Sequence, residues 1–94
     1  MHILDFNKLS LRDINKTLQR SDKNSFFSIR NPKGSHALAV GINKKITVKV
    51  VGSVGYYCAG MNKFSDIKVE GSAGPGLGEN MMSGNVHVTG DVSQ

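Results

Sequence analysis

The apolar positions of this chain recur at a fixed spacing in its C-terminal half. Residues 48–52, 67–71 and 86–90 share the order apolar-x-apolar-x-Gly, and their glycines are 19 residues apart each time. A repeat of about 20 residues is typical of a solenoid, in which each repeat forms one turn of a stack. The alternation of apolar and polar residues is that of a β-strand with one buried face. The pattern therefore predicts stacked β-coils.

The coil length sets the expected geometry of this stack. At about 3.3 Å per extended residue, one coil has a perimeter of about 60 Å, or roughly 20 Å for each side of a triangle. Successive coils lie about 4.8 Å apart, so residues one repeat apart become neighbours in a parallel ladder. We expect two inward columns and one outward column: Ile29, Val48, Ile67 and Val86; Val50, Val69 and Val88; and Lys49, Lys68 and His87.

An earlier segment has the features of a degenerate first coil. Residues 26–31 are strand-like and end at a turn that contains Pro and Gly. Shifting the repeat back by 19 residues aligns Ile29 with Val48, and residues 37–40 then form another side of this coil. Atypical terminal repeats are expected in solenoids.

The segment before this coil predicts one helix. Ser10 is a suitable N-cap, and Asp13 lies in the first turn near the positive end of the helix dipole. We expect residues 1–22 to be a lead-in followed by a helix that caps one end of the stack. The alternative is a docking helix for a partner. The apolar stripe of this helix consists of Leu11, Ile14 and Leu18.

Length and composition limit the domain count and the class of protein. The 94 residues make a single domain, 1–94, whose coils occupy residues 26–94. Eleven glycines favour many tight turns over a helical bundle. The single cysteine excludes an intrachain disulfide and favours the reducing cytoplasm. No apolar run approaches the roughly 20 residues of a membrane span, and the polar N-terminus does not resemble a signal peptide, so we expect no membrane association.

The net charge of +5 raises the question of nucleic-acid binding. All twelve Lys and Arg lie between Lys8 and Lys68, almost all of them singly. No dense basic run and no aromatic-rich RNA-binding motif accompanies them. This distribution argues against a nucleic-acid partner and favours a solvated basic face that meets an acidic partner subunit.

A glycine string at residues 71–78 raises the question of nucleotide binding. A dinucleotide loop needs a helix directly after the string, but only residues 79–84 precede the next predicted strand. The lysine of a P-loop is also missing. Glycines at coil corners, where the backbone needs positive φ or close approach to the next coil, explain the pattern better. The glycines that we assign to this structural motif are Gly52, Gly55, Gly60, Gly71, Gly74, Gly76, Gly78, Gly84 and Gly90.

Cys58 is the residue to consider for catalysis. A thiol with His36 or His87 beside it could act as a nucleophile, but nothing in the sequence places either histidine there. A lone cysteine is more often a small buried hydrophobe, and we expect that role here. One cysteine and three scattered histidines provide no zinc or iron–sulfur spacing, so we expect no metal site.

Three strings in the chain resemble the GXGXG family, whose best-known member is the C-terminal domain of the glutamate synthase large subunit. They are residues 31–37, 52–62 and 71–84. Within them, residues 56–62 and 79–84 are most similar to the stand-alone middle subunit of N-methylglutamate synthase. The β-helix subunit of formylmethanofuran dehydrogenase is a more distant relative.

The resemblance implies an all-β, right-handed parallel β-helix without catalytic residues of its own. It implies a noncatalytic scaffold subunit in a glutamate synthase-like hetero-oligomer that makes N-methylglutamate from glutamate and methylamine. The expected partners are a class II glutamine amidotransferase-like subunit and an FMN-binding, glutamate synthase-like subunit with an iron–sulfur cluster. No cofactor is expected on this chain. The alternatives are a β-helix subunit of another oxidoreductase, such as formylmethanofuran dehydrogenase, and an independent β-helix binding module.

Five polar or aromatic residues are candidates for an interface or a substrate passage. Family members usually continue for several more coils beyond the last one here. Without them, the strand of the last coil has unpaired backbone N–H and C=O groups along one edge. We therefore expect that the chain is a fragment of a longer β-helix or that another chain covers this end. The candidate interface residues are Tyr56, Tyr57, Asn62, Glu79 and Asn80.

Overall fold

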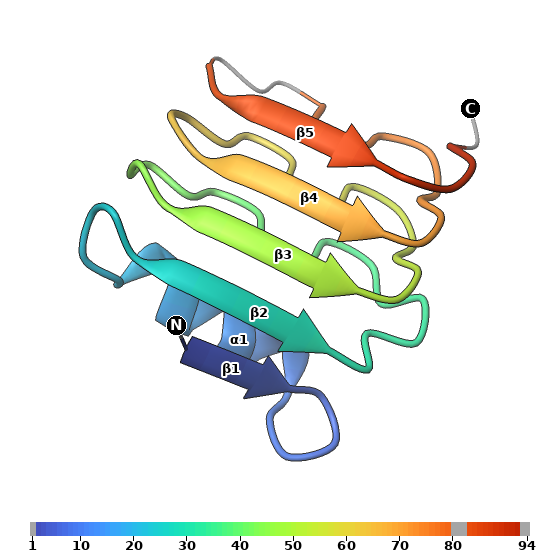
Figure 1. Cartoon of the computed structure of the whole chain (residues 1–94), viewed down its shortest axis with the longest axis horizontal. Helices are drawn as coiled ribbons and strands as arrows, with labels where there is room; N and C mark the ends of the chain where they lie inside the picture. Colours follow the sequence, from blue (N-terminus) through green and yellow to red (C-terminus); the bar gives the residue numbers. More distant parts are fainter. Residues whose placement is uncertain (1, 80–82, 93–94) are drawn as a thin grey trace.

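The computed structural model describes residues 2–79 and 83–92, which form one five-stranded parallel sheet and one helix (Figure 1). The strands are stacked in the order in which they occur along the chain. The parallel β-solenoid predicted from the repeat is therefore confirmed. The elements are β1 (His2–Asp5), α1 (Leu11–Gln19), β2 (Phe26–Arg30), β3 (Thr47–Val51), β4 (Asp66–Glu70) and β5 (Asn85–Val88).

Each coil returns from the end of one strand to the start of the next through a less regular segment. We call residues 37–43, 56–63 and 75–79 the second side of the successive coils. Backbone hydrogen bonds also join these segments: the Ala59 N–H donates to Leu38 O at 2.9 Å, and the Gly78 N–H donates to Cys58 O at 2.8 Å. The coils are thus tied to one another away from the sheet as well as within it.

The predicted register holds for the last three strands. Val48 of β3 lies beside Ile67 of β4, which lies beside Val86 of β5, so each step is 19 residues. Val50, Val69 and Val88 form the second column in the same way. The β3 and β4 members of both columns are 0–2% exposed, as expected for strands with one buried face.

The predicted register of the first coil was wrong by two residues. Phe27 of β2 pairs with Val48, and Ile29 pairs with Val50, so this step is 21 residues long. On the second side, Asn43 bridges to Lys63, a step of 20. The first coil therefore holds one extra residue at each of two corners. A shift of two preserves which side chains face inward, because the side-chain period of a strand is also two.

The lead-in predicted at the N-terminus contains a strand. Leu4 of β1 pairs with Ile29 of β2 and is 8% exposed, so it extends one inward column by another member. The separation of 25 residues between the two strands does not match the repeat. The reason is that α1 takes the place of the second side in this partial coil (Figure 1).

The predicted helix is present and is capped as expected. The Ser10 side chain accepts a hydrogen bond from the Asp13 N–H at 3.1 Å, and Ile14 and Leu18 are fully buried. The helix in turn covers the end of the stack through a pair of amide side chains. Asn15 donates to Ala37 O at 2.9 Å and accepts from the Ala39 N–H at 2.7 Å.

Gln19, one turn further along α1, donates to Val40 O at 2.9 Å. Asn15 and Gln19 therefore occupy ladder positions that a neighbouring strand would otherwise fill. Backbone groups without such partners would be costly to bury. The helix consequently covers the first edge of the second side by hydrogen bonding as well as by apolar contact.

The glycines that follow β4 and β5 allow close stacking of the corners. A Cβ at Gly71 would lie 2.6 Å from the carbonyl carbon of Gly52, and one at Gly90 would lie 2.5 Å from Gly71 O. Real Cβ atoms do not approach backbone this closely, and a backbone carbonyl in a ladder cannot move aside. The 19-residue repetition of glycine is thus a consequence of the spacing between coils.

We expect Gly71→Ala to lower the free energy of unfolding by at least about 2 kcal/mol, because the new methyl group overlaps the Gly52 carbonyl. Gly34→Ala is the matched control. Gly34 also has a positive φ, of 74°, but a Cβ there meets no atom within 4 Å. Urea unfolding followed by circular dichroism measures both. Equal losses for the two variants would show that conformational strain, and not close stacking, explains the requirement for glycine.

Candidate functional site

The second side has an unusual backbone in which left-handed φ values recur at every other residue. A non-glycine residue in this region costs roughly 1–2 kcal/mol, and strain of this kind tends to occur at functional sites. The sequence gives no signal for it in the first two coils, where most of these positions are not glycine. The residues are Ala37 (54°), Ala39 (58°) and Gly41 (66°); Tyr57 (58°), Ala59 (61°) and Met61 (56°); and Gly76 (79°) and Gly78 (65°).

This finding refines the interpretation of the glycine string. We expected its glycines at coil corners, but Gly76 and Gly78 lie within the second side. Their positive φ values agree with the expectation, and they occupy the positions that Tyr57 and Ala59 occupy one coil earlier. The string is therefore the third copy of a backbone pattern, and this copy is the one in which glycine removes the strain.

The same backbone places two consecutive tyrosines on the outside. Consecutive side chains on a regular strand point to opposite faces, but Tyr56 and Tyr57 are 51% and 55% exposed. A Cβ at Gly74 would lie 3.4 Å from Tyr56 Cδ1, and one at Gly76 would lie 2.7 Å from Tyr57 Cδ1. The two rings therefore lie over the two glycines of the next coil, which leave room for them.

His36 holds the Tyr56 ring from the preceding coil. The two rings stack with centroids 4.6 Å apart and an interplanar angle of 12°. The imidazole Nδ1 accepts a hydrogen bond from the Tyr56 N–H at 2.7 Å, so it is the other nitrogen that carries the proton of the neutral ring. Gly55 makes room for this arrangement, since a Cβ there would clash with the imidazole.

Two hollows flank the Tyr57 ring, and both include Tyr57 and Glu79 in their linings. The structure thus brings together three of the five predicted interface residues: Tyr56, Tyr57 and Glu79. The smaller hollow, of about 290 Å³, is lined by Ala37, Val40, Tyr57, Gly60, Met61 and Glu79. The larger, of about 480 Å³, is lined by Tyr56, Tyr57, Pro75, Gly76 and Glu79.

The other two predicted interface residues are not part of this site. Asn62 is 0% exposed, its Oδ1 accepts from the Ile42 N–H at 2.8 Å, and its Nδ2 donates to Ala39 O at 2.8 Å. The expectation that Asn62 faces a partner is corrected accordingly, because its amide is buried inside the solenoid, where it binds the backbone of residues 39 and 42 in the preceding coil. Asn80 lies outside the described residues.

Cys58 points into the core, as expected for a small hydrophobe. It is 0% exposed, and burial raises the pKa of its thiol to about 12. The thiolate is the nucleophilic form of cysteine, so this environment opposes nucleophilic chemistry. Its neighbour on the outer face, Tyr57, is the residue that solvent can reach.

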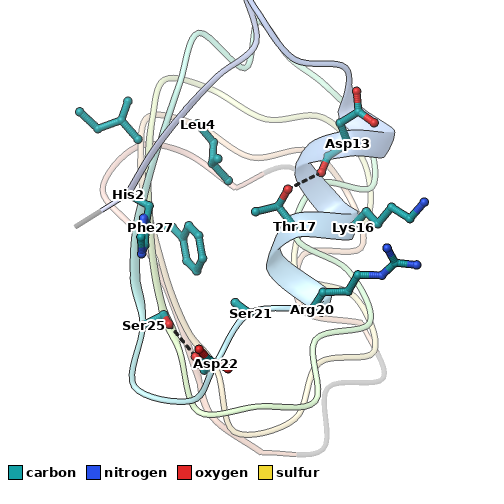
Figure 2. Close-up of a pocket in the computed structure, with 11 residues that line it drawn as sticks. His2, Leu4, Asp13, Lys16, Thr17, Arg20, Ser21, Asp22, Ser25 and Phe27 are labelled. Atoms are coloured by element: carbon teal, nitrogen blue, oxygen red, sulfur yellow. Dashed lines mark hydrogen bonds between the residues drawn. The ribbon is translucent and has the colours of Figure 1, made fainter.

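Another hollow, of about 920 Å³, lies at the N-terminal end of the solenoid. Figure 2 views it between β1 and α1, with Leu4 and Phe27 on the side of the sheet. Lys16 and Arg20 are among its lining residues, and their side chains extend away from β1 in this view.

The outward column on the sheet is partly neutralised. Glu70 lies 3.4 Å from the Lys49 ammonium and 3.8 Å from that of Lys68. Ion pairs this exposed contribute little, about 0–1 kcal/mol.

Among residues 2–79 and 83–92, no three His, Cys, Asp or Glu side chains are grouped as a metal site would require. Over the same residues, the structure contains no helix that is long and apolar enough to cross a bilayer.

Comparison with known proteins identifies a curated relative of this chain. The chain is 50% identical over 89 residues to Protein GlxC of Rhizobium meliloti (strain 1021). The alignment covers 92% of this chain but 39% of that protein, so the chain spans about two fifths of its relative's length. This relationship supports the resemblance to glutamate synthase-like proteins. No family profile and no solved structure matches the chain.

We expect Asn62→Ala to lower the free energy of unfolding by at least about 2 kcal/mol, because the Ile42 N–H and the Ala39 carbonyl lose their partner in the core. Asn43→Ala, at an exposed position of the same side, serves as control and should change stability by less than about 0.5 kcal/mol. Chemical denaturation gives both values. A mild effect of Asn62→Ala would mean that the buried amide is dispensable.

The raised pKa of Cys58 also predicts a pH dependence of stability. The folded chain holds the thiol proton more tightly than the unfolded chain, in which the pKa of the thiol is about 9.0. This contribution is complete below pH 9 and is lost as the pH rises towards about 12. We expect the unfolding free energy to fall by up to about 1.4 kcal/mol per pH unit in this window, relative to Cys58→Ala. Parallel pH profiles for the two proteins would contradict the assignment.

Proposed function

We propose that this chain is a noncatalytic β-solenoid scaffold in a glutamate synthase-like complex, of the kind that forms N-methylglutamate from glutamate and methylamine. The observation that carries the proposal is its 50% identity to Protein GlxC over 92% of the chain. The proposed partners are a class II glutamine amidotransferase-like subunit and a subunit that holds FMN and an iron–sulfur cluster. In this arrangement the chain binds no cofactor itself.

The state of its most reactive side chains supports a noncatalytic role. The Cys58 thiol is buried, and the rise in its pKa keeps it protonated near neutral pH. His36 uses Nδ1 to accept a backbone hydrogen bond and packs its face on Tyr56. Neither residue is therefore available as the partner of the other in a nucleophile–base pair.

The construction of the solenoid supports a scaffold role. Backbone hydrogen bonds join each coil to the next on both the sheet and the second side, so the outer surfaces keep fixed positions relative to one another. The tyrosines do not recur one repeat later, where Pro75 and Gly76 stand, so the surface does not present a repeating aromatic ladder. A surface of this kind is suited to one specific protein contact rather than to a repetitive polymer.

An affinity-tagged copy of the chain, expressed in its native host, should co-purify with a flavoprotein and an amidotransferase-like chain. The FMN absorbance of the purified complex and mass spectrometry of its subunits measure the outcome. Recovery of the chain without partners would contradict the scaffold role.

Cys58→Ala should leave turnover of the complex within about twofold of the wild type, because the thiol has no role in chemistry. Loss of turnover in Cys58→Ala with assembly intact would contradict the noncatalytic role.

A further inference from the structure

The larger hollow beside Tyr57 combines two aromatic rings with a carboxylate. We infer that Tyr56, Tyr57 and Glu79 form a binding site for the guanidinium group of an arginine on a partner chain. The inference rests on the proposed function, because it identifies the chemistry of one contact between this scaffold and a neighbouring subunit.

The first reason is the exposure of adjacent aromatic side chains. Tyr56 and Tyr57 are more than half exposed. Tyr57 has a left-handed backbone conformation, which an aromatic residue rarely adopts. Met61, 63% exposed, continues the apolar surface along the same coil. Tyrosine is enriched where proteins bind one another, since its ring supplies contact area and its hydroxyl a hydrogen bond.

The second reason is that the rings are held in place before any ligand binds. Tyr56 is stacked on His36 from the preceding coil, while Gly74 of the following coil leaves room beneath its ring. Tyr57 lies over Gly76 in the same way. A side chain that is already ordered loses less entropy on binding than a mobile one. The two rings thus form a preorganised surface.

The third reason is the position of a negative charge. A Cβ at Gly76 would lie 2.7 Å from Tyr57 Cδ1 and 3.2 Å from Glu79 Oε2, so the ring and the carboxylate approach the same point of the backbone. Glu79 is the charged residue among those lining the two hollows. Within the described parts of the chain, no Lys or Arg nitrogen lies within 4.0 Å of this carboxylate. Its charge is therefore available to a ligand.

These features select a cation, and the guanidinium group fits them best. The face of an aromatic ring attracts cations, and arginine makes such contacts more often than lysine. A planar guanidinium can stack on a tyrosine ring and donate to a carboxylate at the same time. The neighbouring apolar hollow, lined by Ala37, Val40 and Met61, is suited to the aliphatic part of the partner segment. The open, half-exposed setting favours a side chain of a partner over a free amine, which would need enclosure.

The test is a nuclear magnetic resonance titration of the isotopically labelled chain with two blocked tripeptides. One has arginine between two glycines, and the other has citrulline, which has nearly the same shape but no charge. We expect the arginine peptide to shift the resonances of Tyr56, Tyr57 and Glu79, and the citrulline peptide to bind at least about threefold more weakly. Equal responses to both peptides, or no saturable response to arginine, would overturn the inference.

Matched variants locate the effect. Glu79→Gln and Tyr57→Leu should each weaken arginine-peptide binding at least about threefold. Glu70→Gln removes a carboxylate on the sheet, and Phe64→Leu removes an aromatic side chain that is 56% exposed outside the larger hollow, so neither should change it. An equal loss in Glu70→Gln would show nonspecific electrostatic attraction and overturn the site.

A third titration, with methylammonium chloride, separates the two sources of a cation. Binding as tight as that of the arginine peptide would overturn the assignment to a partner side chain in favour of a free amine.

The titration with the arginine peptide can also be interpreted separately from the proposed complex. If the chain binds the arginine peptide but co-purifies with no subunit, the proposed function fails and the cation site stands. If the complex forms and the arginine peptide does not bind, the inference fails alone.

Discussion

The parallel backbone ladder between successive coils is the constraint on which the rest of the molecule depends. Its spacing of about 4.8 Å leaves no room for a side chain where one corner crosses the next, which explains why Gly52, Gly71 and Gly90 recur at the repeat length. The ladder also forces each inward residue above its equivalent in the next coil. Val48 over Ile67 and Val50 over Val69 fill the interior because β-branched side chains pack well on a pleated surface.

A ladder of this kind must end or bend without leaving backbone groups unpaired, and this chain uses amide side chains for that purpose. Asn15 and Gln19 on α1 complete the first edge of the second side, while the buried Asn62 of the next coil binds the backbone of residues 39 and 42 inside the solenoid. A carboxamide presents both donor and acceptor groups, as a peptide group does, and can therefore replace a piece of strand. The helix covers its end of the stack through these contacts together with the burial of Ile14 and Leu18.

The outer surface differs from this interior in that one part of it carries strain. The left-handed residues of the second side leave Tyr56 and Tyr57 exposed above Gly74 and Gly76, whereas Cys58, which follows the tyrosines, is buried. A fold that served only to bury apolar side chains would not need this arrangement. A rigid stack that displays an aromatic and acidic surface is consistent with a part that positions other chains.

The sequence by itself determined the solenoid, the helix with its Ser10 cap, and the columns of β3, β4 and β5, because period-two alternation and a 19-residue repeat are local properties of the chain. It also indicated Tyr56, Tyr57 and Glu79 as candidates for an interface. Only the tertiary structure decided the 21-residue first step, the pairing of β1 and the burial of Asn62. Corner lengths and hydrogen-bond partners depend on what lies in the adjacent coil. That information resides in contacts between distant residues, so no single segment of the sequence contains it.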